Sequence, residues 1–451
     1  MNNKKETDLG KDKIAVLLLK LALPAILAQI INVLYNMVDR MYIGHIPKIG
    51  SEALTGVGVT MPVIMAISAF AALVSMGGAP KASIMLGKNK KEDAEKILGN
   101  CFVMLIIMAL VLTLVFLFFG KDILLVFGAS NKTIDYALDY MQIYALGTIF
   151  VQLSLGLNAF INAQGFAKTG MLTVAIGAIC NIVLDPILIF GFSLGVKGAA
   201  LATIISQGIS SFWVVFFLVG NKSILKIKLK NLKLEKQIVI PCLALGLSPF
   251  IMQFTESVIS VCFNTSLLKY GGDIAVGSMT ILTSVMQFSM LPLQGLTQGA
   301  QPIISFNYGA NNIGRVKKAF KLLLKCSVIY SMILWLIAIF KPELFVYIFT
   351  NDANLVNHTC WAMRIYMAVS GIFGIQIACQ QTFIAIGNAK KSVFLAILRK
   401  IILLIPLIFI LPLFISNQTF AVFLAEPIAD VIAVLITATM FYQTYSSLSN
   451  E

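Results

Sequence analysis

The sequence predicts an all-α polytopic membrane protein, with twelve transmembrane helices arranged in two pseudo-symmetric six-helix bundles. Three observations predict this fold: the composition, the recurrence of apolar segments, and a repeat that divides the chain in two. Hydrophobic residues make up 59% of the 451 residues and charged residues 12%, and the mean hydropathy is +0.90. Soluble domains are about half apolar and one quarter charged, so this composition excludes a soluble protein.

Apolar segments of about 20 residues alternate with short polar loops, and each is long enough to cross the ~30 Å core of a bilayer as a helix. The first segment runs past the length of a signal-peptide core and has no small-residue cleavage site, so we expect it to be the first helix of the mature protein. The twelve expected spans are residues 21–43, 53–78, 98–119, 134–159, 171–190, 197–219, 238–267, 274–304, 319–340, 358–385, 392–414 and 420–443.

The excess of basic residues follows a topological pattern. Lys and Arg number 34 against 20 Asp and Glu, a net charge of +14, and they collect in alternate loops, at residues 4–13, 88–96, 168, 222–236, 315–318 and 390–391. The positive-inside rule predicts that these loops are cytoplasmic, so both termini of a multi-pass plasma-membrane protein are expected in the cytoplasm. Topology explains the charge without nucleic acid. The expected partners are the lipid bilayer and small molecules, and we expect the chain to act as a monomer.

A repeat divides the chain into two halves. The loop at residues 87–96 recurs at 309–318, and the loop at 163–168 recurs at 385–390, each 222 positions later. Because six spans are an even number, the halves have the same topology and are related by an axis along the membrane normal, an arrangement that suits alternating access. The predicted domains are an N-lobe (1–220), a basic cytoplasmic linker (221–236) and a C-lobe (237–451).

An acid lies inside the fifth apolar segment. Asp185 precedes Pro186 and follows Asn181 by four residues, and a carboxylate in hydrocarbon costs about 2.5 to 3.5 kcal/mol on insertion scales. Proline lacks an N–H and presses on the carbonyl four residues back, so the oxygen of Ile182 is expected to lose its helical partner. A carboxylate, an amide and a free carbonyl within about one turn form a candidate cation or proton site.

Two other spans bring oxygen atoms to the same depth. Asp39 and Asp185 lie four and five residues before the outer ends of their spans, and Thr203 enters the next span from the outside. At ~1.5 Å per residue these side chains share a layer. Oxygen-only ligands suit a hard cation such as sodium, whereas two desolvated carboxylates are also able to carry a proton. We therefore predict an ion-coupling site, for sodium or a proton and with no other cofactor, at Asp39, Asn181, Asp185 and Thr203.

Structural roles are the alternatives for these acids. Asp39 is adjacent to Arg40 near the outer end of the first span, and an ion pair between them is one alternative. The side chains of adjacent residues point about 100° apart on a helix, which disfavours that pair. For Asp185 the alternatives are helix capping or an ion pair with a distant lysine.

Acids in the second half predict a secondary acidic or substrate-binding site. Glu426 and Asp430 in the twelfth span are spaced i, i+4 and lie on one helix face. The alternative for both is pairing with Arg399 or Lys400 in the eleventh span.

The seventh span contributes Glu256 to the same predicted site. No base lies near it, so its alternative is a buried hydrogen bond to Gln253 or Ser260. Polar and aromatic residues of the first half are further candidates for contacting flat cationic substrates by cation–π interaction. These are Tyr35, Asn36, Tyr140 and Tyr144.

Enzyme motifs are absent from the sequence. Neither G-x-x-x-x-G-K-[ST] nor H-E-x-x-H occurs, and the two histidines fall at expected outer loops or helix ends. We therefore predict that the chain is not an enzyme and does not use ATP directly. An ion gradient is the remaining energy source, at about 2.3 kcal/mol per charge per 100 mV.

Three motifs, in their order and spacing, resemble one known family. They are Leu23-Pro24 with Asp39 and Tyr42-Ile43-Gly44 in the first span, Asn181-x-x-x-Asp185-Pro186 in the fifth, and residues 198–203 in the sixth. Together with the two six-span halves, they are similar to the multidrug and toxic compound extrusion (MATE) family over nearly the whole chain, and most similar to a bacterial branch of it.

The resemblance implies export of cationic, amphipathic compounds by sodium or proton antiport. It implies that the ion binds in the N-lobe, because the family's aspartates, asparagine and threonine match Asp39, Asn181, Asp185 and Thr203. Other members use acids of the second lobe, and Glu256 resembles their glutamate. Their aspartate in the tenth span has no counterpart in residues 376–381, so we expect the coupling ion in the N-lobe.

Other functions fit the sequence less well. A lipid-linked oligosaccharide flippase shares the two-lobed plan, but it has about fourteen helices and needs arginines for a pyrophosphate headgroup. A membrane-embedded enzyme would require a nucleophile or metal constellation that the sequence does not display. A channel is disfavoured because a repeat pair with buried acids suits alternating access better than a continuous pore.

Overall fold

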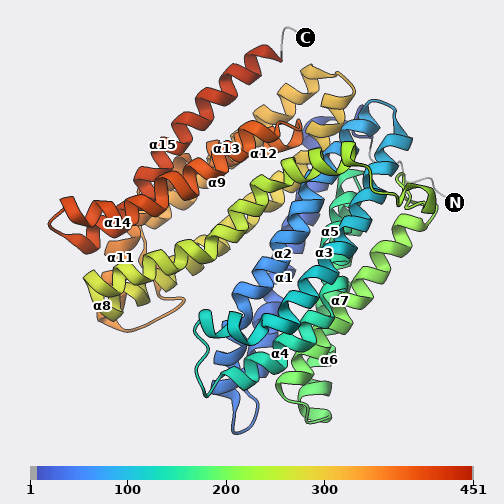
Figure 1. Ribbon diagram of the computed structural model, residues 1–451. Coiled ribbons are helices and arrows are strands. Elements are labelled where there is room, and N and C mark those ends of the chain that lie inside the picture. Colours follow the sequence, from blue (N-terminus) through green and yellow to red (C-terminus); the bar gives the residue numbers. More distant parts are fainter. Residues whose placement is uncertain (1–7, 449–451) are drawn as a thin grey trace.

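The computed structural model describes residues 8–448, and every regular element within them is a helix (Figure 1). Elements η1 and η4 are π-helices, and η2 and η3 are 3-10 helices. The order is α1 (Ile14–Gly44), α2 (Gly50–Gly87), α3 (Lys91–Val126), α4 (Ile134–Leu146), α5 (Thr148–Ala163), α6 (Ala167–Pro186), η1 (Ile187–Gly191), α7 (Val196–Val219), η2 (Leu229–Asn231), α8 (Lys236–Gly309), α9 (Ile313–Phe340), α10 (Glu343–Val346), α11 (Ala353–Tyr366), η3 (Ser370–Ile372), α12 (Phe373–Ala385), α13 (Ala389–Ile397), η4 (Leu398–Leu404), α14 (Ile405–Phe414) and α15 (Gln418–Ser447).

These helices account for the twelve predicted spans. Nine helices of the described chain are long and apolar enough to cross a membrane, or eleven when the bent pairs α4–α5 and α11–α12 are each taken as one span. Helix α8 has 74 residues and a non-helical backbone at Gly272, with φ 65° and ψ −163°. A straight helix of that length would measure ~110 Å, far more than a bilayer core. Gly272 therefore divides α8 into two spans, and the predicted all-α, two-bundle fold is confirmed.

Two spans differ from the expected continuous helices. The span predicted at residues 134–159 bends by 58° between α4 and α5, and the span predicted at 358–385 bends by 49° between α11 and α12. The first bend lies at Gly147, and the second lies beside Gly371. Glycine next to serine or threonine is a common cause of sharp bends. Both glycines also pack tightly, since an added Cβ would lie 2.2 Å from Ile204 Cγ2 and 2.8 Å from Met332 Sδ.

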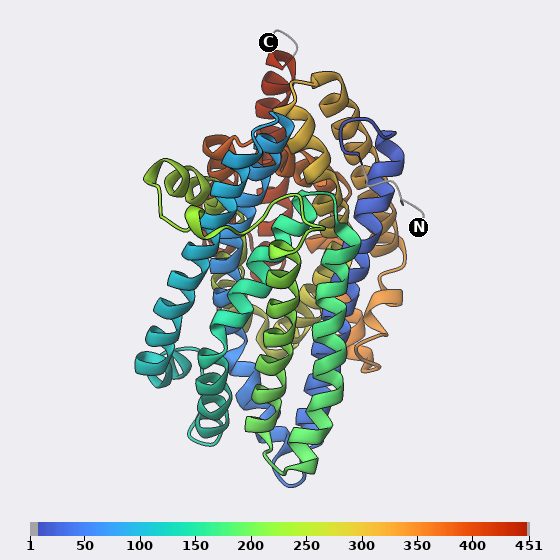
Figure 2. The ribbon, with the colours of Figure 1, turned by 90° about the vertical axis from the view of Figure 1, so that its right-hand side faces the viewer.

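Figure 1 shows two bundles that meet at one end of the molecule and diverge toward the other. Helices α1–α7 form one bundle, and in Figure 2 these N-lobe helices lie side by side. Both arms of α8 and the helices after it form the other bundle. Helix α7 ends at Val219 and α8 begins at Lys236, while the exact domain limits stay a prediction. The basic linker lies at the end where the bundles meet (Figure 1).

Glycines bring the lobes together at that end. A Cβ on Gly87 would lie 2.0 Å from the Phe306 carbonyl oxygen, and a Cβ on Gly309 would lie 2.0 Å from the Ile84 carbonyl oxygen. Phe306 and Gly309 follow Ile84 and Gly87 by 222 positions each. The two contacts are therefore one contact repeated by the pseudo-symmetry, and any larger residue would push the lobes apart.

Candidate functional site

Three N-lobe helices bring the predicted ion-coupling residues together. Asp39 comes from α1, Asn181 and Asp185 from α6, and Thr203 from α7. The side-chain nitrogen Nδ2 of Asn181 donates to Asp185 Oδ1 at 3.2 Å and to Thr203 Oγ1 at 3.4 Å. The carboxyl groups of Asp39 and Asp185 are close enough to interact directly. The site is thus a compact set of oxygen atoms around the Asn181 amide.

The site has more buried oxygen atoms than hydrogen-bond partners. Asp185 is 0% exposed and Asp39 is 6% exposed. Asp39 Oδ1, Asn181 Oδ1 and Asp185 Oδ2 are buried without any hydrogen-bond partner. Within residues 8–448, no basic side chain forms an ion pair with either carboxylate. Buried carboxylates without a base require a proton or a bound cation.

The alternative explanation for Asp39 fails on geometry. The Arg40 guanidinium donates to the sulfur of Met61 at 3.1 Å and forms no ion pair with Asp39 in the described chain. Arg40 points away because adjacent helical residues diverge by about 100°. Asp39 is left to face the interior of the N-lobe.

The backbone changes its winding directly after Asp185. Helix α6 ends at Pro186, and η1 continues the span as a π-helix from Ile187 to Gly191. Proline cannot donate a backbone hydrogen bond, so the regular α-helical pattern is interrupted there. Short π-helical segments occur often at functional sites. The expected loss of the Ile182 carbonyl's partner stays a prediction.

A small cavity adjoins the site. It has a volume of about 40 Å³ and is lined by Asn158, Asn181, Thr203 and Ser206, among others. This volume holds water, because one water needs about 10–15 Å³ of such space. Asn158 Oδ1 and Ser206 Oγ are buried without partners. Sequence reasoning missed these two residues, although polar residues spaced by one turn, such as Thr203 and Ser206, were a usable signal.

A larger cavity lies between the lobes. Its volume is about 310 Å³, and both lobes contribute to its lining, including Gln29, Asn162, Gln253 and Gln301. Asn158 lines both this cavity and the small one. Two of the four ion-coupling residues, Asn181 and Thr203, thus line a cavity that adjoins the space between the lobes.

The predicted substrate-contact residues lie in the N-lobe, and one of them borders the small cavity. The rings of Tyr140 and Tyr144 stack with centroids 6.0 Å apart, and both side chains are buried. Tyr35 borders the small cavity, and Asn36 Nδ2 donates to the backbone oxygen of Asn32 at 2.6 Å. Their role as substrate contacts stays a prediction.

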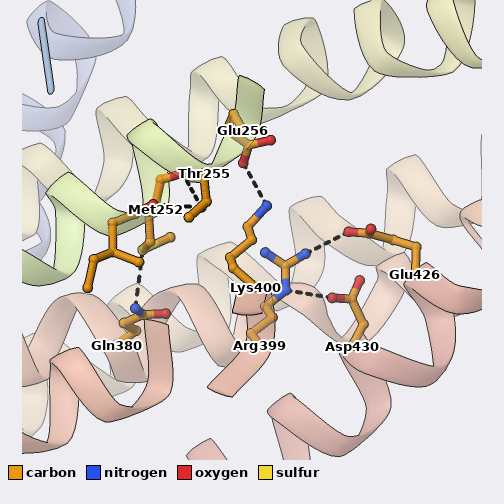
Figure 3. A network of polar contacts seen from close by, with 9 residues as sticks. Met252, Thr255, Glu256, Gln380, Arg399, Lys400, Glu426 and Asp430 are labelled. Atoms are coloured by element: carbon orange, nitrogen blue, oxygen red, sulfur yellow. Dashed lines mark hydrogen bonds and ion pairs between the residues drawn. The ribbon is translucent and has the colours of Figure 1, made fainter. Parts of the chain in front are cut away.

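The C-lobe acids have fixed basic partners, as Figure 3 shows. Arg399 Nε donates to Asp430 Oδ1 at 2.7 Å, and its Nη2 donates to Glu426 Oε1 at 2.9 Å. The guanidinium carbon also lies 4.5 Å from the centre of the Phe373 ring. The alternative of pairing with Arg399 is confirmed for Glu426 and Asp430.

The absence of a base near Glu256 was a wrong expectation. Lys400 Nζ donates to Glu256 Oε1 at 2.6 Å, whereas the alternative considered for Glu256 was a hydrogen bond to Gln253 or Ser260. The two partners are 144 positions apart and come from η4 and α8, so sequence proximity gave no sign of the pair. Arg399 and Lys400 are adjacent in the π-helix η4, and they reach acids on different helices because successive side chains diverge.

No cluster of three His, Cys, Asp or Glu residues that could hold a metal ion occurs among residues 8–448. The N-lobe set has only two carboxylates, completed by the Asn181 amide and the Thr203 hydroxyl. This donor set fits a monovalent hard cation or a shared proton, since transition metals prefer imidazole and thiolate ligands.

The family model described as MatE matches residues 24–187 and 249–410. The chain belongs to the MatE family. The match includes Asp39 and Asp185 in one segment and Glu256 and Lys400 in the other. One MatE segment lies in each half of the repeat, and the two cover nearly equivalent positions at the offset of 222. The resemblance drawn from the sequence motifs is confirmed.

Relatives of this MatE chain carry a common name. The multidrug export protein MepA of Staphylococcus aureus is 28% identical over 424 residues, covering 92% of this chain and 91% of the relative. MepA of Staphylococcus haemolyticus is 25% identical, covering 93% and 92%. The match extends over nearly the full length of both proteins.

Solved structures share the fold. A MATE structure in the bent conformation has a TM-score of 0.92 at 21% identity and covers 99% of each chain. An outward-facing multidrug resistance MATE transporter has a TM-score of 0.90 at 21% identity and also covers 99% of each chain. The two-lobed arrangement of twelve helices is therefore the arrangement of MATE transporters.

Proposed function

We propose that this chain is a secondary active exporter of cationic, amphipathic compounds, driven by sodium or proton antiport. The observation that carries the proposal is the set of buried, unpartnered oxygens on Asp39, Asn181 and Asp185. Two carboxylates without a fixed base are stable in the membrane only when a mobile cation occupies or protonates them. The relatives' printed name, multidrug export protein, supports export as the direction of transport.

The arrangement of the lobes supports alternating access. The lobes contact each other at the end that carries the basic linker (Figure 1), and the positive-inside rule assigns that end, with both termini, to the cytoplasm of the plasma membrane. The other end, where the bundles diverge, then faces outward. A cation from outside reaches Asp39 and Asp185, neutralises them, and favours the conformation that takes up substrate from the inside.

Reconstitution in proteoliposomes tests the coupling. A sodium gradient and a proton gradient are imposed separately, and movement of a cationic dye such as ethidium is followed by fluorescence. We expect one of the two gradients to drive the dye against its own concentration gradient. In the proposed mechanism, binding of that ion to the N-lobe carboxylates is coupled to transport. Antiport is excluded if neither gradient moves dye while the protein is correctly folded and oriented. Protein-free liposomes give the background rate.

A further inference from the structure

The Glu256–Lys400 ion pair joins an open carboxylate to a buried base. The Glu256 side chain is 56% exposed, whereas the Lys400 side chain is 7% exposed. Gln253 lies three positions before Glu256 on α8, on the same helix face, and lines the cavity between the lobes. Glu256 therefore lies within one helical turn of a residue that lines this cavity, and its exposed carboxylate is accessible to a cation.

The neighbouring triad of Arg399, Glu426 and Asp430 is buried and has more acids than bases. Arg399, Glu426 and Asp430 are each 4–5% exposed, and one guanidinium serves both carboxylates (Figure 3). When both acids are ionised, two acids and one base leave one negative charge in a low-dielectric region, which is costly unless another cation is near. Arg399 contacts two carboxylates and the Phe373 ring, so its guanidinium is already paired within the triad.

Lys400 lies close to both Glu256 and the triad of Arg399, Glu426 and Asp430. Its ammonium is bonded to Glu256, and it also acts electrostatically on Glu426. The lysine side chain is long and flexible, and it binds one carboxylate at a time as a point charge. Loss of Glu256 as a partner would therefore not leave Lys400 unpaired, because the triad offers it an uncompensated negative charge.

We propose that Lys400 is a tethered cation that competes with the substrate for Glu256. When a cationic group binds the exposed face of Glu256, the Lys400 ammonium moves toward Glu426 and Asp430. The C-lobe thus responds to the charge of the substrate, while the N-lobe responds to the coupling ion. This inference rests on the export of cations proposed above, and it makes Lys400 a residue that sets specificity for substrate charge.

Dye binding to the purified full chain in nanodiscs tests the competition. Ethidium affinity is measured by fluorescence anisotropy for the wild type, Lys400→Met and Lys400→Arg. We expect Lys400→Met to bind about tenfold tighter, because a competing ion pair worth about 1.4 kcal/mol is removed. Lys400→Arg keeps the charge and is expected to bind as the wild type does. Lys400→Gln replaces the methionine variant if the latter does not fold.

A double-mutant cycle tests the movement of Lys400. Glu426 is buried and has no contact with the cavity, yet Glu426→Gln removes the second place for Lys400 and is expected to weaken ethidium binding about three- to tenfold. The same substitution added to Lys400→Met is expected to change the affinity by less than about twofold. A purely structural role for Glu426 would instead give equal losses in both backgrounds. Asp430→Asn provides a second test of the same cycle.

The outcomes separate the two proposals. If the wild type exports ethidium but folded Lys400→Met binds it no more tightly, the competition is overturned and the proposed export stands. If the wild type neither binds nor exports cationic dyes, both are overturned. An uncharged amphipathic compound serves as the control, and its affinity is expected to be unaffected by Lys400→Met.

Discussion

The same three spans of the repeat carry buried acids in both lobes, but only the C-lobe acids are paired with bases. In the N-lobe, α1, α6 and α7 bring together two carboxylates, an amide and a hydroxyl without a base. In the C-lobe, the equivalent spans are the first arm of α8, the α13–η4–α14 span and α15, and they bring together three carboxylates and two bases. Each lobe also has a π-helix in its middle span, η1 or η4.

This difference in pairing indicates which lobe is expected to need a cation from outside the chain. Each of the three C-lobe acids forms an ion pair with Arg399 or Lys400, which belong to the chain, so these acids do not depend on an ion from outside for a partner. Within residues 8–448 the N-lobe acids have no such partner, and in the proposed mechanism a proton or a sodium ion neutralises them. The two equivalent positions therefore differ in whether the chain itself supplies the counter-charge.

The largest effect is expected from neutralising the N-lobe. Asp185→Asn removes one of the two carboxylates without changing the size of the side chain, so Asp39 alone holds the cation and the response to the gradient is expected to be lost. Dye efflux from cells is expected to fall to the level of cells without the protein, at equal expression. Unchanged efflux in a well-expressed variant would contradict the assignment of this site.

A large loss of stability is expected when Arg399 of the C-lobe is replaced. Arg399→Leu leaves Glu426 and Asp430 buried without a partner, which costs about 3–5 kcal/mol. Thermal unfolding in detergent is the measurement, with the triple variant Arg399→Leu, Glu426→Gln, Asp430→Asn as control. We expect the triple variant to recover most of the loss. Equal stability of Arg399→Leu and the wild type would mean that the ion pairs of Arg399 do not stabilise the C-lobe.

A smaller effect is expected at the edge of the N-lobe site. Thr203→Val keeps the shape of the side chain and removes one oxygen, at a cost of about 1 kcal/mol, or about fivefold in ion affinity. The ion concentration that half-activates efflux is the measurement, and Thr203→Ser is the control that retains the hydroxyl. Identical half-activation in Thr203→Val and the wild type would exclude Thr203 as a ligand.

Sequence patterns predicted the N-lobe site better than the C-lobe network. The spacing of Asn181 and Asp185 by one turn, and the shared depth of Asp39 and Thr203, are local properties of helices that must cross a bilayer of fixed thickness. Lys400 and Glu256 are 144 positions apart, and their contact depends on how α8 packs against η4. The bends at Gly147 and beside Gly371 were missed for the same reason, because they depend on close packing with neighbouring helices.

The sequence by itself determined the class of the protein, the number of spans, the repeat and the identity of the buried acids. These follow from hydrophobicity and from the cost of placing charge in hydrocarbon, which act on each span alone. Only the tertiary structure decided which acids have partners. Pairing depends on the direction of side chains from helices that are distant in sequence, and that direction is fixed when the helices of each lobe pack together.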